Sequence, residues 1–269
     1  MSPTPPGFGS PLSITYIGTA TAILHIGDVN FLTDPVFSPV GTTWDLGIVT
    51  LETLKSAALG LADLPPIDAV LLSHEDHPDN LDEPGRQTLE GRHVLTTPDG
   101  AKRLAPRPGV RALQPWETVT LKLGGRNFDI TGTPCVHLPG GEVTGFIVTT
   151  EEFGKTDGKP NAIYFSGDTV YIPELAKMKE TWHISVAIIN NGKVMVELPD
   201  AGEPLQITVG GADAAKLFRD IEADVFVPMH YESWAHFTEG KEQLAAELEK
   251  EGVSDKVIWL TPGSTTKIA

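Results

Sequence analysis

Two histidines and several carboxylates follow closely on an apolar run of the chain. Residues 69–73 are continuously apolar up to a serine, which is typical of a strand buried on both faces. The next nine residues, 74–82, read HEDHPDNLD. Neutral imidazole and carboxylate are the ligand types that Zn²⁺ takes in open catalytic sites. A solvated acidic turn with incidental histidines is the plainer interpretation, but the spacing favours a metal site.

Three further residues of metal-ligand type, His137, Asp168 and His230, each come just after a predicted strand. Each signal is weak alone, because an aspartate in a turn commonly bonds its own backbone and a lone histidine usually fills core or surface. Cys135 could be a soft ligand, but cysteine is more often a small buried apolar residue. Taken together, four strand ends carry candidate ligands, and sheet enzymes place functional groups there. We therefore predict one shared metal site.

Aromatic residues and a second imidazole follow His230 closely, in the order Tyr231, Trp234, His236 and Phe237. If His230 faces the metal, these side chains are expected to line the mouth of the site. Tyr231, Trp234 and His236 are then predicted to bind substrate, and His236 to stabilise an oxyanion rather than ligate the metal. The alternative is that the rings pack the start of the next helix and His236 points to solvent.

The surrounding pattern predicts strands first and helices later in each half of the chain, which indicates an α/β fold of two packed sheets with helices outside. Amphipathic spacing predicts helices over 212–221 and 241–250 and permits a short one at 51–58. A closing strand is expected over 257–260. Residues 1–11, rich in Pro, Gly and Ser, are expected to be a flexible lead-in, and 12–269 a single domain.

The composition limits the partners. The chain has 269 residues, with 36 acidic and 20 basic side chains and a formal net charge of −16. Such a surface repels phosphate backbones and anionic lipids, so neither a nucleic acid nor a membrane surface is expected as partner. One cysteine rules out an internal disulfide, and neither a signal peptide nor a membrane span is visible. We expect a cytoplasmic protein with a small-molecule substrate, and a homo-oligomer is compatible with the sequence.

The order of these motifs resembles the metallo-β-lactamase superfamily. The opening segments Tyr16-Ile17-Gly18-Thr19-Ala20 and Leu32-Thr33-Asp34-Pro35-Val36 are similar to the branch holding ascorbate-6-phosphate lactonase and N-acylphosphatidylethanolamine phospholipase D. The resemblance runs from about Ile14 to the end of the chain. It implies an αββα sandwich of two mixed β-sheets with helices outside, and a metal site at one edge between the sheets.

The resemblance also implies a set of metal ligands: His74, His77, Asp79, His137, Asp168 and His230. The first motif matches only if one residue is inserted. The insertion could instead make Asp76 the ligand and leave His77 a bystander. Asn80 stands where the family has a histidine for a second metal, and Thr19 where the branch often has one.

This resemblance implies a hydrolase that uses one or two Zn²⁺ ions, with Mn²⁺ or Fe²⁺ as alternatives because carboxylates are hard ligands. Such an ion lowers the pKa of a bound water to about 7, and Asp79 is expected to orient that water and move its proton. The expected substrate is a small carbonyl compound: a lactone, a lactam or another ester or amide. The alternatives are a phosphodiesterase or phospholipase-D-like hydrolase, and a non-catalytic metal-binding protein with a degenerate site.

Overall fold

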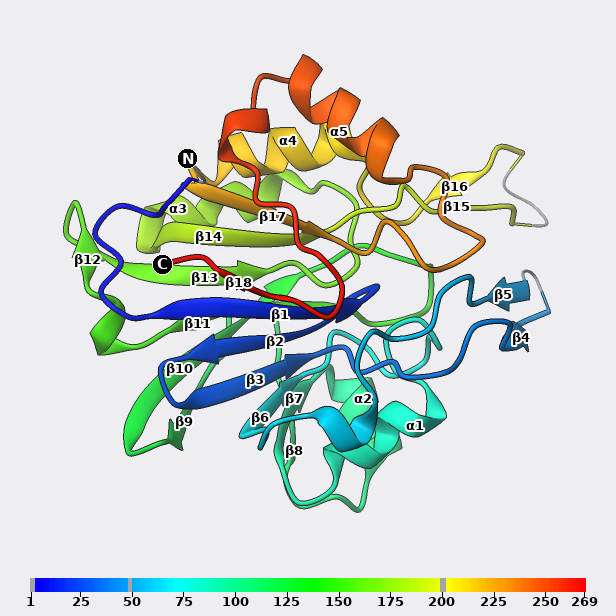
Figure 1. Ribbon diagram of the computed structural model, residues 1–269, viewed down its shortest axis with the longest axis horizontal. Coiled ribbons are helices and arrows are strands. Elements are labelled where there is room, and N and C mark those ends of the chain that lie inside the picture. Colours follow the sequence, from blue (N-terminus) through cyan, green and yellow to red (C-terminus); the bar gives the residue numbers. More distant parts are fainter. Residues whose placement is uncertain (1–2, 48–49, 199–201) are drawn as a thin grey trace.

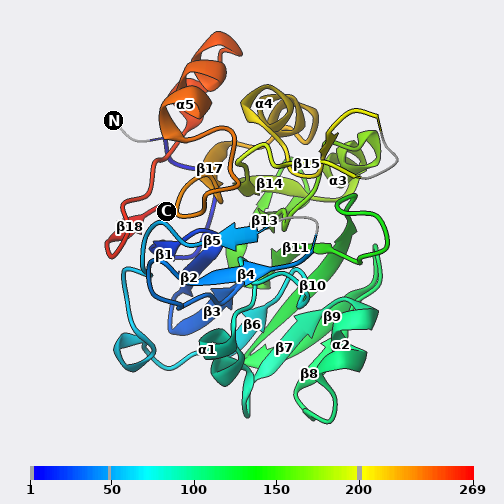
Figure 2. The same cartoon turned by 90° about the vertical axis from the view of Figure 1, so that its right-hand side faces the viewer.

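The computed structural model describes residues 3–47, 50–198 and 202–269, and these form two packed β-sheets between two layers of helices (Figure 1). The architecture confirms the predicted αββα sandwich. In both views the short helices of the first half lie on one outer face, and those of the second half lie on the other (Figures 1 and 2). No described helix has the length and apolar character needed to cross a membrane.

The first sheet is mixed. Its β1, β2 and β3 form an antiparallel meander, and its β6, β7 and β8 continue from β3 in parallel. The order across the sheet is β18 (Thr265–Lys267), β1 (Leu12–Gly18), β2 (Thr21–Ile26), β3 (Val29–Thr33), β6 (Ala69–Leu71), β7 (His93–Thr96) and β8 (Val110–Ala112).

The second sheet is also mixed, with antiparallel pairing from β9 to β13 and parallel pairing from β13 through β14 to β17. The order is β17 (Val225–Met229), β14 (His183–Asn190), β13 (Lys159–Phe165), β11 (Thr144–Thr149), β10 (Arg126–Pro134) and β9 (Thr118–Leu123), with β12 (Lys155–Thr156) beside β13.

Helices cover the outer faces. The first sheet carries α1 (Glu83–Arg86) and α2 (Pro98–Leu104), and the second carries α3 (Met178–Thr181), α4 (Gly211–Asp220) and α5 (Lys241–Lys250). The longer ones, α4 and α5, bury an apolar side against the second sheet. Between the sheets lies the main core, which includes Phe31, Phe128 and Phe146. The predicted helices 212–221 and 241–250 are confirmed as α4 and α5 to within a residue.

Two hairpins project at one edge of the sandwich: β4 (Thr43–Asp45) with β5 (Thr50–Glu52), and β15 (Met195–Val196) with β16 (Leu205–Gln206). Both lie at the same edge in Figures 1 and 2.

Two expectations from the sequence are wrong. Residues 51–58 form no helix, because Leu51 pairs in a hairpin and Thr53 bridges to Trp234. Residues 257–260 form only a bridge to β17, and the last strand is β18.

The lead-in segment contacts the second sheet. Residues 1 and 2 lie outside the described residues. Further on, the Phe8 ring lies 4.5 Å from the Phe153 ring, measured between centroids, and the backbone N–H of Gly9 donates to Phe153 O at 3.0 Å. The side-chain amide of Asn161 in β13 also donates to Gly7 O at 2.9 Å, so the beginning of the described chain is attached to the second sheet at β13 and at the segment that follows β11.

Candidate metal centre

Four strands deliver one candidate ligand each to the same edge of the sandwich. His74 follows β6, His137 follows β10, Asp168 follows β13 and His230 follows β17. In the second sheet, β13 and β17 are parallel to β14, so their carboxyl ends meet at one edge. The backbone N–H of Thr144 donates to Ser73 O at 3.0 Å and thereby joins this edge to the first sheet.

Three imidazoles form the first group of potential ligands: His74, His77 and His137. Nε2 of His74 lies 3.0 Å from Nδ1 of His77, and Nε2 of His137 lies 3.2 Å from the same Nδ1. His74 is buried, and the other two are half-buried. The structure therefore gathers the predicted His77, and not Asp76, with His74 and His137.

Two carboxylates and an imidazole, from Asp79, Asp168 and His230, form the second group, and all three are buried. Nε2 of His230 lies 3.4 Å from Oδ2 of Asp79 and 3.4 Å from Oδ2 of Asp168. The side-chain amide of Asn190, the last residue of β14, donates to Oδ1 of Asp168 at 2.7 Å. This bond leaves the Oδ2 atom of Asp168 directed at His230.

Hydrogen bonds on the far side of each ring fix which nitrogen carries the proton. Nδ1 of His137 donates to Ile207 O at 2.7 Å, and Nδ1 of His230 donates to Asn191 O at 3.2 Å. Nδ1 of His74 lies 2.9 Å from the Ser73 hydroxyl, which itself donates to Asp34. The Nε2 atoms of all three rings therefore face the site, where a cation could displace any proton that they carry.

Burial and neighbouring charges set the ionisation states. Burial, with the nearby imidazoles of His77 and His137, lowers the pKa of His74 well below its usual value. Burial would raise the pKa of Asp79, but the neighbouring imidazoles of His230 and His236 outweigh it and hold that pKa well below the usual range. Burial lowers the pKa of His230, yet Asp168 and Asp79 prevail and raise it to about 9.

The backbone is strained where the strands end. His230 has φ 59° and its N–H donates to the carbonyl of Thr19, which has φ 52°. The β-branched side chain of Thr19 disfavours this left-handed region more than the imidazole of His230 does, and such strain persists where the surrounding structure enforces it. Gly167 has φ 57°, and a Cβ there would meet Thr144 O at 2.7 Å. Glycine at 167 is therefore what lets Asp168 approach the first sheet.

A cavity of about 210 Å³ opens over both ligand groups. Its floor is formed by His77, Asp79, His137, Asp168 and His230. The walls are mostly apolar and come from the two hairpins and the segments beside them: Leu46, Leu51, Leu138, Val194, Met195, Val196 and Ile207. Asp76 and His236 complete the described lining.

Three residues were predicted to bind substrate: Tyr231, Trp234 and His236. Of these three, only His236 lines the cavity. Tyr231 points to the other face of β17, where its ring meets Trp259 edge-on at 5.7 Å between centroids. Trp234 packs under the β4–β5 hairpin against Trp44, and its Nε1 donates to the Thr19 hydroxyl at 3.0 Å. Both rings are used in packing and lie outside the described cavity lining, and the substrate-binding role of Tyr231 and Trp234 stays a prediction.

The remaining candidates of the sequence have other contacts. Asp76 lies on the rim of the cavity and is exposed. The amide of Asn80 donates to Oδ2 of Asp34 at 3.1 Å, below the ligand groups. The thiol of Cys135 contacts Ser166 O at 3.4 Å, and burial raises its pKa, so it behaves as a buried neutral group.

Sequence reasoning missed the residues that support the ligands. Asp34 follows β3 and Asn190 ends β14, so the strand-end signal that pointed to His74 applied to them too. The apolar walls had no such signal, because Leu46 and Val196 belong to short hairpins whose pairing depends on tertiary contacts.

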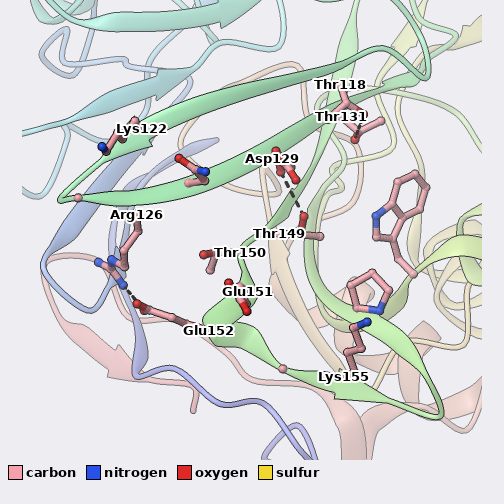
Figure 3. Close-up of a pocket in the computed structure, with 15 residues that line it drawn as sticks. Thr118, Lys122, Arg126, Asp129, Thr131, Thr149, Thr150, Glu151, Glu152 and Lys155 are labelled. Atoms are coloured by element: carbon pink, nitrogen blue, oxygen red, sulfur yellow. Dashed lines mark hydrogen bonds and ion pairs between the residues drawn. The ribbon is translucent and has the colours of Figure 1, made fainter.

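A second, larger hollow lies on the outer face of the second sheet (Figure 3). It has a volume of about 880 Å³ and is lined by polar side chains of β9, β10 and the loop after β11, among them Thr131, Asp129 and Lys122. Arg126 and Glu152 form an ion pair across it at 2.7 Å (Figure 3). Its described lining contains no histidine or cysteine.

An αββα sandwich with clustered histidines and aspartates at one sheet edge defines a class of metal-binding hydrolase folds. The family model described as a beta-lactamase superfamily domain matches residues 29–231. The chain therefore belongs to the metallo-β-lactamase superfamily, and the resemblance drawn from its motifs is confirmed.

A curated relative matches nearly the whole chain, and solved structures share its fold. A UPF0173 metal-dependent hydrolase of Methanopyrus kandleri is 25% identical over 94% of this chain and 99% of its own. Two solved structures share the fold over 96% of this chain and 99% of theirs. They are an isothiocyanate hydrolase from Delia radicum gut bacteria (22% identity, TM-score 0.74) and the metallo hydrolase Igni18 from Ignicoccus hospitalis (20% identity, TM-score 0.71).

Proposed function

We propose that this protein is a Zn²⁺-dependent hydrolase of a small carbonyl substrate, namely a lactone, a lactam or another ester or amide. The observation that carries the proposal is the convergence of unprotonated imidazole nitrogens from His74 and His137 on His77 beneath an apolar cavity. Facing lone pairs repel one another unless a proton or a cation lies between them, so this arrangement suits a cation.

The distances also fit a metal. With metal–nitrogen bonds of about 2.0–2.1 Å, neighbouring ligand atoms lie roughly 2.9–3.4 Å apart in octahedral or tetrahedral geometry. The nitrogen separations of 3.0 and 3.2 Å in the first group fall in this range. Nε2 of His230 is buried without a hydrogen-bond partner among the described residues, which also fits a ligand position.

His74, His77 and His137 would hold one cation, and Asp79, Asp168 and His230 would hold or share a second. Such a cation polarises a carbonyl oxygen and lowers the pKa of a water. Asp79 remains a carboxylate at neutral pH because His230 and His236 hold its pKa low. We propose that it orients the attacking water by accepting a hydrogen bond from it, since a carboxylate with so low a pKa is a weak proton acceptor.

The cavity sets the kind of substrate. Its volume is below the roughly 300–1,000 Å³ of sites for drug-sized ligands, so a small substrate fits. Seven apolar side chains would hold the hydrocarbon part and exclude water. Neither lysine nor arginine lines the described cavity, and Asp76 adds a negative charge at the rim. These features favour a neutral carbonyl compound, because a phosphodiester would meet positive charge mainly on the proposed cations and not on the cavity walls.

Metal analysis and turnover test the proposal together. Protein purified without chelator should contain at least one transition metal per chain, and His74→Ala and His137→Ala should lose it. The intact protein should hydrolyse at least one lactone, lactam, ester, amide or isothiocyanate of a panel that also contains phosphodiesters. A preference for phosphodiesters would favour the phosphodiesterase alternative. Bound metal without turnover on any compound would favour the non-catalytic one.

A further inference from the structure

The imidazole of His236 is aimed at the second group of ligands. It belongs to the loop that joins β17 to α5, and its Nε2 lies 3.1 Å from Oδ2 of Asp79. The same Oδ2 atom lies 3.4 Å from Nε2 of His230. The His236 side chain is only 10% exposed, and it lines the cavity beside the ligand groups. Two imidazole nitrogens therefore converge on one buried carboxylate oxygen.

Asn80, the neighbour of Asp79 in sequence, does not share this position. Its side-chain amide donates to Oδ2 of Asp34, and the residue is completely buried. The second group thus has one imidazole and two carboxylates from Asp79, Asp168 and His230. Zn²⁺, which accepts both nitrogen and oxygen ligands, binds more tightly when a further nitrogen ligand is added.

We propose that His236 is a protein ligand of a second divalent cation, together with Asp79, Asp168 and His230. This rests on the proposed metal-dependent function and gives His236 a ligand role in place of the substrate-binding role that its sequence position suggests. Oδ2 of Asp79 lies 3.1 Å from Nε2 of His236 and 3.4 Å from Nε2 of His230, and ligand atoms around one cation with bonds of about 2.0–2.2 Å have separations of this size.

The contacts of the ring's other nitrogen predict the strength of this ligand. Nδ1 of His137 and Nδ1 of His230 each donate to a backbone carbonyl, which fixes the ring. Nδ1 of His236 is buried and finds no hydrogen-bond partner in the described parts of the chain. Because such outer contacts strengthen a ligand, His236 should be the weakest of these imidazoles, and the second cation should bind less tightly than the first.

The test is a metal titration of the full chain with Zn²⁺ alone, comparing the wild type with His236→Gln. The matched control is His93→Gln, at the first residue of β7, because it removes an imidazole at the opposite end of the sheet. We expect two Zn²⁺ per chain in the wild type and the control. In His236→Gln the first site should be retained and the second weakened by at least about tenfold.

A second measurement on the unaltered protein does not depend on the variant folding. With ¹¹³Cd in place of Zn²⁺ and ¹⁵N-labelled protein, metal–nitrogen couplings count the imidazoles on each cation. Two imidazoles on the weaker site, one of them His236, support the proposal. Equal two-site binding in His236→Gln, a single site in the wild type, or one imidazole on the weaker cation would overturn it. Absence of turnover with these metal results intact would contradict only the proposed hydrolysis.

Discussion

The hydroxyl of Ser73 donates a hydrogen bond to Oδ2 of Asp34 at 2.7 Å, and the backbone N–H of Ser73 donates to Oδ1 of the same carboxylate at 2.7 Å. Having given its proton to Asp34, the hydroxyl can only accept from Nδ1 of His74, 2.9 Å away. Asp34 therefore acts through Ser73 to keep the Nε2 lone pair of His74 directed at the site.

Replacing Ser73 should weaken metal binding without unfolding the protein. In Ser73→Ala the His74 ring loses its outer partner, and loss of such a contact typically lowers metal affinity by about 10–100-fold. Competition with a chelator dye measures the affinity of the first site. Ser185→Ala is the matched control, because Ser185 is an equally buried serine of β14 whose hydroxyl has no hydrogen-bond partner among the described residues. Equal affinities in the two variants would contradict the positioning role of Ser73.

Asn80 is expected to support the structure rather than the metal. In Asn80→Ala the buried Asp34 loses one donor, which should lower the free energy of unfolding by about 1–3 kcal/mol. The number of bound Zn²⁺ ions should stay the same. Urea unfolding and elemental analysis measure the two quantities, and the exposed Asn127→Ala is the control for stability. Loss of one cation in Asn80→Ala would identify Asn80 as a ligand after all.

The strands that carry His74, Asp168 and His230 were predictable because each is a short continuous apolar run that ends in a polar residue. Sequence alone could not place Trp234, whose indole is held by the distant Thr19 hydroxyl. Nor could it find β18, whose residues Thr265–Lys267 are polar and become a strand only by pairing with β1. Contacts between segments far apart in the chain decide these features, and local periodicity does not record them.

The Asp79–His230–Asp168 group should make the metal-free protein less stable in alkali. Burial opposes protonation of His230, but the two carboxylates raise its pKa to about 9 in the folded state, against about 6.5 when unfolded. The folded protein therefore binds more protons between these values, so this stabilisation is complete below about pH 6.5 and is lost as the pH rises through about 9.

Denaturant unfolding of chelator-treated protein at about pH 6 and about pH 9.5 measures this loss. The wild type should lose roughly 3 kcal/mol more than His230→Gln over the interval. The difference between the two proteins removes the contribution of other groups that titrate there. Parallel pH profiles of the wild type and His230→Gln would show that the carboxylates do not hold a proton on this imidazole.

Gly167→Ala should disturb the metal site more than Gly158→Ala, although both glycines have a left-handed backbone conformation. Gly167 has φ 57°, and a Cβ there would lie 2.7 Å from Thr144 O and 2.8 Å from the Ser73 Cβ. Gly158 has φ 80°, and a Cβ there would meet nothing within 4 Å. Both alanine variants incur the left-handed penalty of about 1–2 kcal/mol, but only Gly167→Ala forces the two sheets apart at the ligands.

We therefore expect Gly167→Ala to be about 1–3 kcal/mol less stable than Gly158→Ala, as is typical of overpacked interiors. Because Asp168 follows directly, Gly167→Ala should also bind Zn²⁺ more weakly, whereas Gly158→Ala should bind it like the wild type. Thermal unfolding of the metal-free proteins and a Zn²⁺ titration measure both effects. If the two variants matched in stability and in affinity, the close approach of Gly167 to Ser73 would have no part in forming the metal centre.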